Sequence, residues 1–594
     1  MNRLPMPAWV LLLVCCLLSR AGRAAEGATR LRLATFSADV TVPLGHGMMG
    51  GSWLSKSIAD PLEAHGFVLL DGGAPVVFVS VDWCEIRNDA YERWQTVLAK
   101  AAGTKPERVV VTAVHQRDAP VADLEAERLL RARILAGTVC DLDFHERAVQ
   151  NVAEALRESL RSARPFTHVG TGQGKVERIA SNRRYTKPDG SVSFDRMSRT
   201  SDPIAIAADE GLIDPWLKTL SFWDADTPLA AVSFYAVHPM SYYGAGDVSA
   251  DFPGLARRKR QAETPGVEQI YCTGCAGNLT AGKYNDGNHE NRIALADRLH
   301  AAMVAAWRDT KRHPVSHFDF HVTPLRLEPR DSAGFTVAEL EAKLTPVTEP
   351  FQQCLAAMGL SWRRRVDAGQ RIQIPTLNFG VAELLLLPGE SYVEYQLAAQ
   401  RARPESFVCV AGYGEGATGY IPTEKHIAEN DPNLGDWCWV APGSEERMRS
   451  AISAALSASE PPKAPDTRGS PEGGARFKLP TATKSKPDVV IYEGAYPGWP
   501  WVAKGADGTL HCVFREGTQH ESRMRACGLQ GTKRRMKGVP ARLSWFWTGG
   551  PRNGQPLGPN AQTSRRAAAH SGVLGMVRVK SIGSALIWPG ISQL

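Results

Sequence analysis

The sequence predicts an α/β fold in which layered mixed sheets are flanked by helices, followed by a linker and a fragmentary all-β blade. Short apolar runs rich in β-branched residues end at polar loops, which indicates buried strands. Longer segments between these runs carry apolar residues at helical spacing, and such alternation is typical of a layered domain. Further along, the composition shifts to Pro, Gly, Ser, Lys and Glu before a second strand-rich segment begins.

Residues 1–25 are predicted to be a signal peptide. A basic start precedes 11 apolar residues, 8–18, which are enough for a signal sequence and too few to cross a bilayer. Small residues follow, so cleavage is expected after Ala24 or Ala25. No later stretch is apolar and long enough for a transmembrane anchor, and the mature protein is therefore predicted to be secreted or periplasmic.

Residues 26–458 are predicted to form the main domain. The whole chain carries 69 Lys+Arg and 62 Asp+Glu, but residues 522–594 contain 12 of the basic residues and none of the acidic ones. The rest of the chain is therefore mildly acidic, which argues against a nucleic-acid partner. The expected strands are 75–81, 108–114, 229–237 and 382–387, and the clearest helices are 143–161 and 291–307.

Three further segments are predicted after the main domain. Residues 459–487 have the composition of an extended linker. Residues 488–520 form a partial β blade, in which Asp507-Gly508 marks a hairpin turn. Residues 521–594 are a basic tail, which we expect to be unstructured or an out-of-frame translation because acidic residues vanish there for 73 positions. The alternative is a genuine basic tail that binds anionic polymers.

Four polar residues each stand where a strand-like run enters a loop: His115, His238, Glu390 and Tyr420. Loops at strand ends are frequent places for active-site residues. Two neutral imidazoles and a carboxylate suit Zn²⁺, which keeps an open position for water in catalytic sites. Spacing alone leaves the matter open, since no HExxH-like motif occurs and a single His is more often a structural hydrogen-bonding residue.

The order of the motifs resembles that of the neutral/alkaline, non-lysosomal ceramidase family. The resemblance covers most of residues 31–456. The motifs are, in order, Asp39-Val-Thr41, Gly47-Met-Met-Gly50, His115, Asn182-Arg183-Arg184, His238-Pro239, Gly274 to Thr280, Pro388-Gly-Glu390 and Gly419-Tyr-Ile-Pro-Thr-Glu424. The six motifs from His115 onward stand in family order, which is more specific than any one of them, and the two N-terminal motifs fit as well.

The resemblance implies a zinc ion held by His115, His238, Glu390 and Tyr420. His115 lies in VHQRDAP, which corresponds to the family's THTHSGP, and His238 lies in the HP motif. Glu390 matches the Glu of PGE, and Tyr420 in YIPT matches the Tyr of YITT. The strand-end pattern and the resemblance thus select the same four residues.

The sequence also departs from the family pattern. Arg117 replaces the second histidine of THTHSGP, and an arginine cannot act as a general base at neutral pH. Thr280 takes the position of the serine regarded as catalytic in the family, and Asn278 takes that of an aspartate. We predict catalytic roles for Thr280, Arg117 and Arg183. The predicted substrate-binding residues are Arg184 and Asn278.

The resemblance implies hydrolysis of an N-acyl (amide) bond in a small-molecule or lipid substrate of the sphingolipid type. A lipid substrate would bring the enzyme into peripheral contact with membranes. Two alternatives stay open. One is a catalytically impaired homologue that binds a lipid or glycan, and the other is a sialidase-like glycosidase. The second rests on residues 488–518, which resemble the first blade of sialidase-like (BNR) propellers.

Overall fold

The computed structural model describes residues 30–457 in full and, beyond them, the backbone of six short strands between residues 489 and 579. The chain divides into two compact units, residues 1–466 and 467–594. The predicted signal peptide and linker lie outside the described residues. Among the described helices, none is both long and apolar enough to cross a membrane.

The first sheet has the strand order β10-β1-β5-β6-β8 and ends, at β8, next to the candidate site. Its strands pair antiparallel except β6 and β8, which run parallel. The expected strands 75–81 and 108–114 are β6 and β8. The bounds are β1 Arg32–Asp39, β5 Glu63–Leu70, β6 Val76–Val81, β8 Val109–Ala113 and β10 Arg164–Pro165.

Two further mixed sheets complete the first unit, with orders β18-β16-β15-β11-β20 and β21-β22-β23-β25. Each contains one parallel pair, β16 with β18 and β23 with β25. The second sheet comprises β11 His168–Lys175, β15 Trp216–Asp224, β16 Thr227–Tyr235, β18 Glu268–Thr273 and β20 Lys311–Pro314. The third comprises β21 Asp319–Leu325, β22 Ile372–Asn378, β23 Ala382–Leu386 and β25 Phe407–Ala411.

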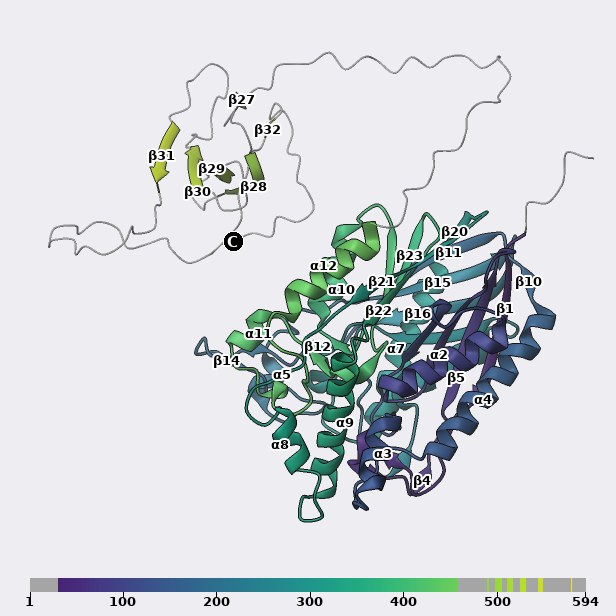
Figure 1. Ribbon diagram of the computed structural model, residues 1–594. Coiled ribbons are helices and arrows are strands. Elements are labelled where there is room, and N and C mark those ends of the chain that lie inside the picture. The colour runs from purple at the N-terminus through teal and green to yellow at the C-terminus, as the bar shows by residue number, and fades with distance from the viewer. Residues whose placement is uncertain are drawn as a thin grey trace, which may run out of the picture. The chain divides into compact units, whose positions relative to one another are not determined.

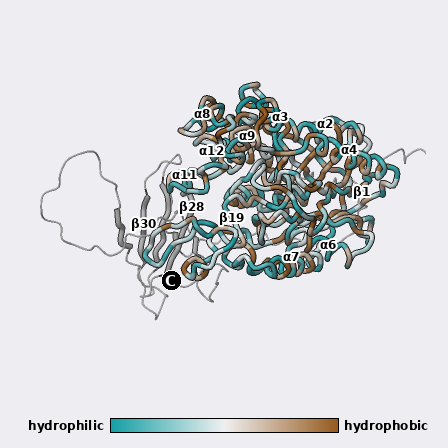
Figure 2. The backbone as a smooth tube through the Cα atoms, turned by 90° about the horizontal axis from the view of Figure 1, so that it is seen from below, coloured by the Kyte–Doolittle hydropathy of each residue, from teal (hydrophilic) through white to brown (hydrophobic). Residues whose placement is uncertain are grey.

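Helices cover the sheets from both sides. Figure 1 shows α2 and α4 lying across the first sheet, and α4 packs against β1. In Figure 2 α6 and α7 lie on the side opposite α2, α3, α4 and α9, where α6 packs on β18 and α7 on β11 and β15. The longer helices are α2 Asn88–Ala102, α3 Leu124–Ala132, α4 Leu142–Ser159, α6 Asp251–Glu263, α7 Glu290–Arg308, α9 Pro350–Asp367, α10 Val393–Ala402 and α12 Ser444–Ser457.

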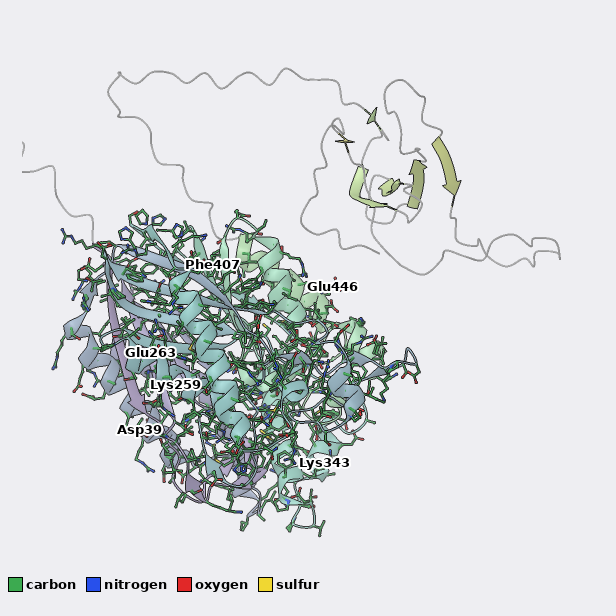
Figure 3. All side chains as sticks on the ribbon, turned by 180° about the vertical axis from the view of Figure 1, so that it is seen from behind. Asp39, Lys259, Glu263, Lys343, Phe407 and Glu446 are labelled. Carbon is green, nitrogen blue, oxygen red and sulfur yellow. The ribbon has the colours of Figure 1, made fainter. Side chains whose placement is uncertain are left out.

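The outer faces of these helices are charged. Lys259 and Glu263 lie on the outer side of α6 (Figure 3), where they pair with Asp297 and His300 of α7. The inner faces are apolar, and α7 buries Leu295 among others. This division of polar and apolar residues explains why the helices at 143–161 and 291–307 were predictable as α4 and α7.

The inner strands, such as β6, are apolar on both faces because they lie between two layers. In β6, Val77 and Val79 face the cluster beneath the helices, whereas Phe78 faces a second cluster between the sheets. There the ring of Phe67 stacks on Phe78 at 5.1 Å and contacts Phe222 of the second sheet at 5.1 Å. The continuous apolar runs of the sequence therefore mark strands buried on both sides, and the predicted layered α/β class is confirmed.

The second unit contains a four-stranded antiparallel sheet with the order β28-β29-β30-β31, and a separate pair, β27 with β32. β28 and β29 pair antiparallel, as the predicted hairpin at Asp507-Gly508 requires. β30 and β31 fall within 521–594, so the boundary at residue 520 and the nature of the tail remain predictions. The bounds are β27 Val489–Val490, β28 Pro497–Lys504, β29 Leu510–Glu516, β30 Met524–Leu529, β31 Leu543–Trp547 and β32 Arg578–Val579.

Candidate metal centre

Three strand ends bring His115, His238 and Glu390 together. His115 follows β8, His238 follows β16, and Glu390 begins the short strand β24 (Glu390–Ser391) just after β23. All three side chains are fully buried, and their possible ligand atoms lie within 4.8 Å of one another. Chain segments more than 100 residues apart thus form one compact cluster.

The ligand atoms of the cluster face one another. Oε2 of Glu390 lies 3.1 Å from Nε2 of His115 and 2.8 Å from Nε2 of His238. The two Nε2 atoms are 3.1 Å apart. The second carboxylate oxygen, Oε1 of Glu390, is buried without a hydrogen-bond partner among the described residues.

Backbone carbonyls determine which nitrogen of each imidazole faces the cluster. Nδ1 of His115 lies 2.8 Å from the carbonyl of Cys84, and Nδ1 of His238 lies 2.6 Å from that of Ala276. A carbonyl only accepts hydrogen bonds, so each Nδ1 carries the proton and each neutral Nε2 offers a lone pair. Three acceptors therefore converge, and they can remain together only if a positive charge lies among them. Such a donor set fits Zn²⁺.

Without a metal, a proton supplies this positive charge. Burial lowers the pKa of His115, but the Glu390 carboxylate and Cys84 more than offset this effect and raise the pKa to about 10. The pKa of His238 is lowered, first by burial and then by the charge of Arg183. Burial raises the pKa of Glu390, but His115 and His238 outweigh it and hold the pKa well below its ordinary value. The cluster thus holds a proton when no metal is present, and the same three residues could hold a metal cation.

Tyr420 lies next to Glu390 because β24 pairs in parallel with β26 (Tyr420–Ile421), with Glu390 opposite Tyr420. The ring of Tyr420 is 6.4 Å from that of His238. Arg183 donates a hydrogen bond of 2.7 Å from Nη1 to the Tyr420 hydroxyl. Burial raises the pKa of Tyr420, and the Arg183 charge opposes this rise. The position beside the cluster agrees with Tyr420 as a fourth ligand, which remains a prediction.

Arg117 brings a permanent positive charge to the cluster. Its Nε lies 3.3 Å from the sulfur of Met240, and the side chain forms no ion pair within the fully described part of the chain. Burial lowers the pKa of Arg117. The charges of Glu390 and Cys84 outweigh this effect, so the pKa is raised. The guanidinium is therefore always charged, and the residue is buried, with only 7% of its surface exposed.

The loop that contains Asn278 and Thr280 borders the cluster. Nδ1 of His238 lies 3.1 Å from the carbonyl of Leu279. The Thr280 hydroxyl, however, donates to the carbonyl of Met197 at 2.7 Å and accepts from the backbone of Gly282 at 3.2 Å. These bonds hold the loop, and the catalytic role predicted for Thr280 stays a prediction.

Asn278 and Arg184 have polar partners of their own. The Asn278 side chain accepts from the backbone of Val393 at 3.0 Å and donates to Glu394 at 2.9 Å, at the start of α10. Arg184 forms two bonds of 2.6 Å with Glu429 and lines a cavity of about 270 Å³. Their predicted substrate-binding roles are untested by this geometry.

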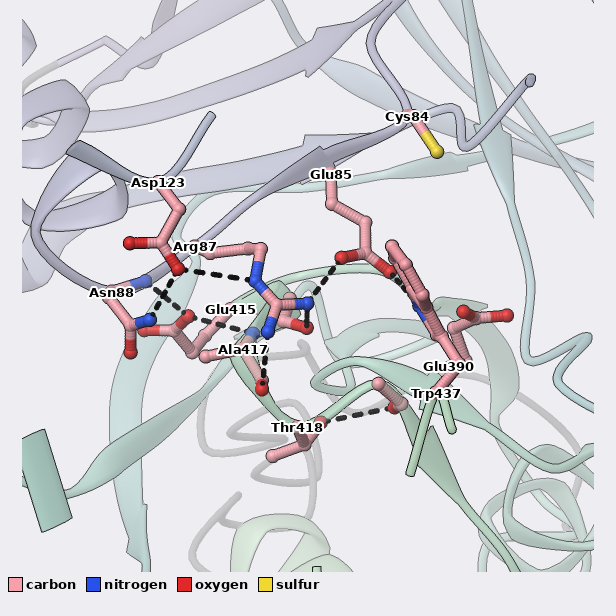
Figure 4. Close-up of polar contacts among 12 residues, drawn as sticks. Cys84, Glu85, Arg87, Asn88, Asp123, Glu390, Glu415, Ala417, Thr418 and Trp437 are labelled. Atoms are coloured by element: carbon pink, nitrogen blue, oxygen red, sulfur yellow. Dashed lines mark hydrogen bonds and ion pairs between the residues drawn. The ribbon is translucent and has the colours of Figure 1, made fainter. Parts of the chain in front are cut away.

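Sequence reasoning missed a buried ionic network behind the cluster (Figure 4). Arg87 donates to Glu85 at 2.7 Å and to the carbonyls of Gly416 and Ala417 at 3.2 and 3.0 Å. Glu85 in turn lies 4.0 Å from Nδ1 of His115. Arg87 thus joins the loop beside His115 to the loop that leads to Tyr420. The signal that could have revealed it is the charged pair in Glu85-Ile-Arg87, four residues after the end of the buried strand β6.

Comparisons with known proteins agree on the fold. No family model and no curated protein matches the sequence. A solved structure described as a ceramidase complexed with C2 is similar with a TM-score of 0.53 and 16% identity, over 88% of this chain and 94% of that chain. The neutral ceramidase from Pseudomonas aeruginosa is similar with a TM-score of 0.54 and 18% identity, over 87% of this chain and 92% of that chain. The chain therefore contains a domain with the neutral ceramidase fold.

Proposed function

We propose that this protein is an exported, zinc-dependent hydrolase that cleaves an N-acyl (amide) bond. The observation that carries the proposal is the convergence of three buried side chains that could ligate a metal, those of His115, His238 and Glu390. The similarity to ceramidase structures supports this class of reaction. When bound, Zn²⁺ would lower the pKa of a water molecule to about 7 and polarise the scissile carbonyl.

The surrounding residues prepare the site for this chemistry. The carbonyls of Cys84 and Ala276 fix the two imidazoles in the orientation that a metal requires. Arg183 holds the oxygen of Tyr420 and can also stabilise negative charge on a substrate. Burial of the whole cluster keeps bulk solvent away from it, which strengthens each of these electrostatic interactions.

The charges favour a substrate with an anionic or strongly polar group near the scissile bond. Arg117 and Arg183 are both buried beside the cluster, and neither forms an ion pair with a carboxylate in residues 30–457. A buried guanidinium without an anionic partner is costly, so a substrate anion would stabilise it. We therefore propose a polar N-acyl lipid of the sphingolipid type, met through peripheral membrane contact, as the substrate class.

One observation favours a second candidate, a homologue that binds a lipid or glycan with little turnover. The Thr280 hydroxyl, at the position of the family's catalytic serine, is already bonded to the backbone of Met197. If that hydroxyl is required for catalysis, the bond would suppress it. Turnover of an N-acyl substrate separates the two candidates.

Metal analysis of the purified mature chain tests the proposal. We expect near-stoichiometric zinc in the wild type, and loss of most zinc and of N-acyl hydrolysis in His115→Ala/His238→Ala. His145→Ala is the matched control, since His145 is also buried but lies on α4, outside the cluster. Full zinc content in the double variant would refute the metal site. Full zinc in the wild type without turnover would favour the binding protein.

A further inference from the structure

Tyr413 occupies a strained backbone position directly beside the cluster. It follows β25 through Gly412 and has a φ of +55°, in the left-handed region that bulky residues rarely adopt. Its carbonyl accepts a 3.0 Å bond from the backbone of Ala113, at the end of the strand that leads to His115. The Thr112 hydroxyl donates to the carbonyl of Gly412 at 2.7 Å. The strain is thus maintained by bonds to the segment that holds His115.

The ring of Tyr413 lies against both histidines. It stacks on His115 with a centroid distance of 4.1 Å and an interplanar angle of 19°. It meets His238 edge-on at 6.1 Å and 83°. The groups whose charges act on its hydroxyl are those of Glu390, Tyr420, Arg117 and Arg183. The phenol therefore belongs to the same enclosed environment as the candidate ligands.

The Tyr413 hydroxyl is buried and has no hydrogen-bond partner among the described residues. Two other buried tyrosines are satisfied, since Tyr91 donates to the carbonyl of Val111 at 3.2 Å and Tyr395 to that of Pro422 at 2.7 Å, whereas the hydroxyl of Tyr235 also lacks a partner among the described residues. A buried hydroxyl without a partner costs stability. Strain and an unpaired polar group at one residue both point to a role outside folding.

We propose that the Tyr413 hydroxyl is a catalytic hydrogen-bond donor to the oxygen of the scissile carbonyl. This inference rests on the proposed hydrolase function. Two other donors nearby have protein partners: the Thr280 hydroxyl bonds Met197, and Nη1 of Arg183 bonds Tyr420, although Nε of Arg183 is buried without a partner among the described residues. The Tyr413 hydroxyl, unlike these two bonded donors, is free to bond an incoming oxygen.

The hydrolytic step is an attack of water on the amide carbonyl, followed by loss of the amine. The oxygen of water forms a bond to the carbonyl carbon, and the C=O π pair moves to the carbonyl oxygen, which becomes negatively charged. Tyr413 donates a hydrogen bond to that oxygen and keeps its proton. When the pair returns, the C–N bond breaks and the amine nitrogen takes up a proton from the attacking water. A donor that strengthens its bond as charge develops lowers the barrier more than it improves binding.

Tyr413→Phe tests the proposal in the full mature chain, with Tyr91→Phe as the matched control. We expect Tyr413→Phe to keep its zinc, to melt no lower than the wild type, and to lose about 100- to 1,000-fold in kcat with KM changed less than about threefold. Tyr91→Phe should melt lower, because it loses a satisfied bond, and should keep its kcat. Unchanged kcat in Tyr413→Phe, or a lower melting temperature together with zinc loss, would overturn the proposal.

A binding measurement keeps this test independent of the proposed function. If the wild type hydrolyses no N-acyl substrate, the proposed function fails, and calorimetric titration with inorganic phosphate, a tetrahedral oxyanion, still examines Tyr413. We expect phosphate to bind Tyr413→Phe at least about tenfold more weakly than the wild type or Tyr91→Phe, in line with the loss of one hydrogen bond to a charged oxygen. Equal affinities would refute the donor role.

Discussion

Two buried polar clusters lie side by side in this protein. They differ in how the negative charge of their carboxylates is balanced. Around Arg87, the protein itself supplies the cation, because one guanidinium bonds Glu85, Asp123 and two backbone carbonyls. Around Glu390, three acceptors meet, and a proton on His115 lies between them when no metal is present. Full burial is common to both. A buried network whose carboxylates are paired with a protein cation is typical of a structural role. Buried acceptors that lack such a cation indicate a site that binds a ligand.

Exchanging a carboxylate for an amide in each cluster should have opposite consequences. Glu390→Gln removes a candidate ligand charge, and we expect zinc affinity to fall by more than about 100-fold, beyond the loss typical of a group behind the ligands. Glu415→Gln, in the Arg87 network, should keep its zinc and lose stability, since Glu415 accepts bonds from the backbone of Asn88 and Ala417. Zinc titration and chemical denaturation of both variants measure these effects. If Glu415→Gln loses as much zinc affinity as Glu390→Gln, the two carboxylates do not differ in role.

Removing the central cation should break the closed network. Arg87→Met leaves Glu85 and Asp123 buried without their partner, which should lower the free energy of unfolding by about 3–5 kcal/mol. Arg128→Met is the control, because Arg128 forms an exposed pair with Asp89 that should contribute about 0–1 kcal/mol. If chemical denaturation shows that Arg87→Met and Arg128→Met lower the free energy of unfolding equally, the buried network does not stabilise the fold more than an exposed ion pair.

The stability contributed by the cluster of His115, His238 and Glu390 should depend on pH when no metal is bound. The folded-state pKa of His115 is raised to about 10 from an ordinary value of 6.5, so its stabilising charge is present below pH 6.5 and is lost as pH rises towards 10. We expect the melting temperature of the zinc-free protein to fall across this window more than that of His115→Ala. Zinc must displace the same proton, so zinc affinity should rise over the same window. If the stability of the zinc-free wild type and that of His115→Ala depend on pH in the same way, His115 and Glu390 do not share a proton.

The charge of Arg117 should affect specificity more than rate. Arg117→His removes a permanent positive charge beside Glu390, and we expect the preference for anionic over neutral N-acyl substrates to fall by about tenfold, as for the loss of a moderate ion pair. The readout is the ratio of kcat/KM values on a charged and a neutral substrate of equal acyl length. An unchanged ratio would show that Arg117 does not face the substrate.

The smallest effect is expected from the C-terminal unit. Truncation after Pro487 should leave the melting temperature and hydrolase activity of the first unit unchanged, because the two units are separately compact. Full-length and truncated chains can be compared by calorimetry and by turnover of one N-acyl substrate. A large fall in melting temperature would show that the second unit stabilises the first.

Much of the fold and part of the site were predictable from the sequence because they depend on local pattern. The run at 75–81 is apolar at every position but one, since β6 is buried on both faces, and the apolar stripe of 291–307 predicts α7. His115, His238 and Glu390 were predicted as site residues because each lies two to four residues after the end of such a strand. Their order along the chain then led to the ceramidase fold, which the structure confirms.

Other features depended on contacts between residues far apart in the chain. Nothing local shows that the Thr280 hydroxyl is bonded to Met197, 83 residues away, or that Arg87 reaches the carbonyl of Ala417, 330 residues away. Tyr413 was invisible for the same reason, because its left-handed backbone and its stacking on His115 arise where two strand ends meet. The sequence by itself determined which residues can bind a metal, through their chemistry and their place at strand ends. Only the tertiary structure decided which polar groups are paired, since pairing depends on distances that no local pattern encodes.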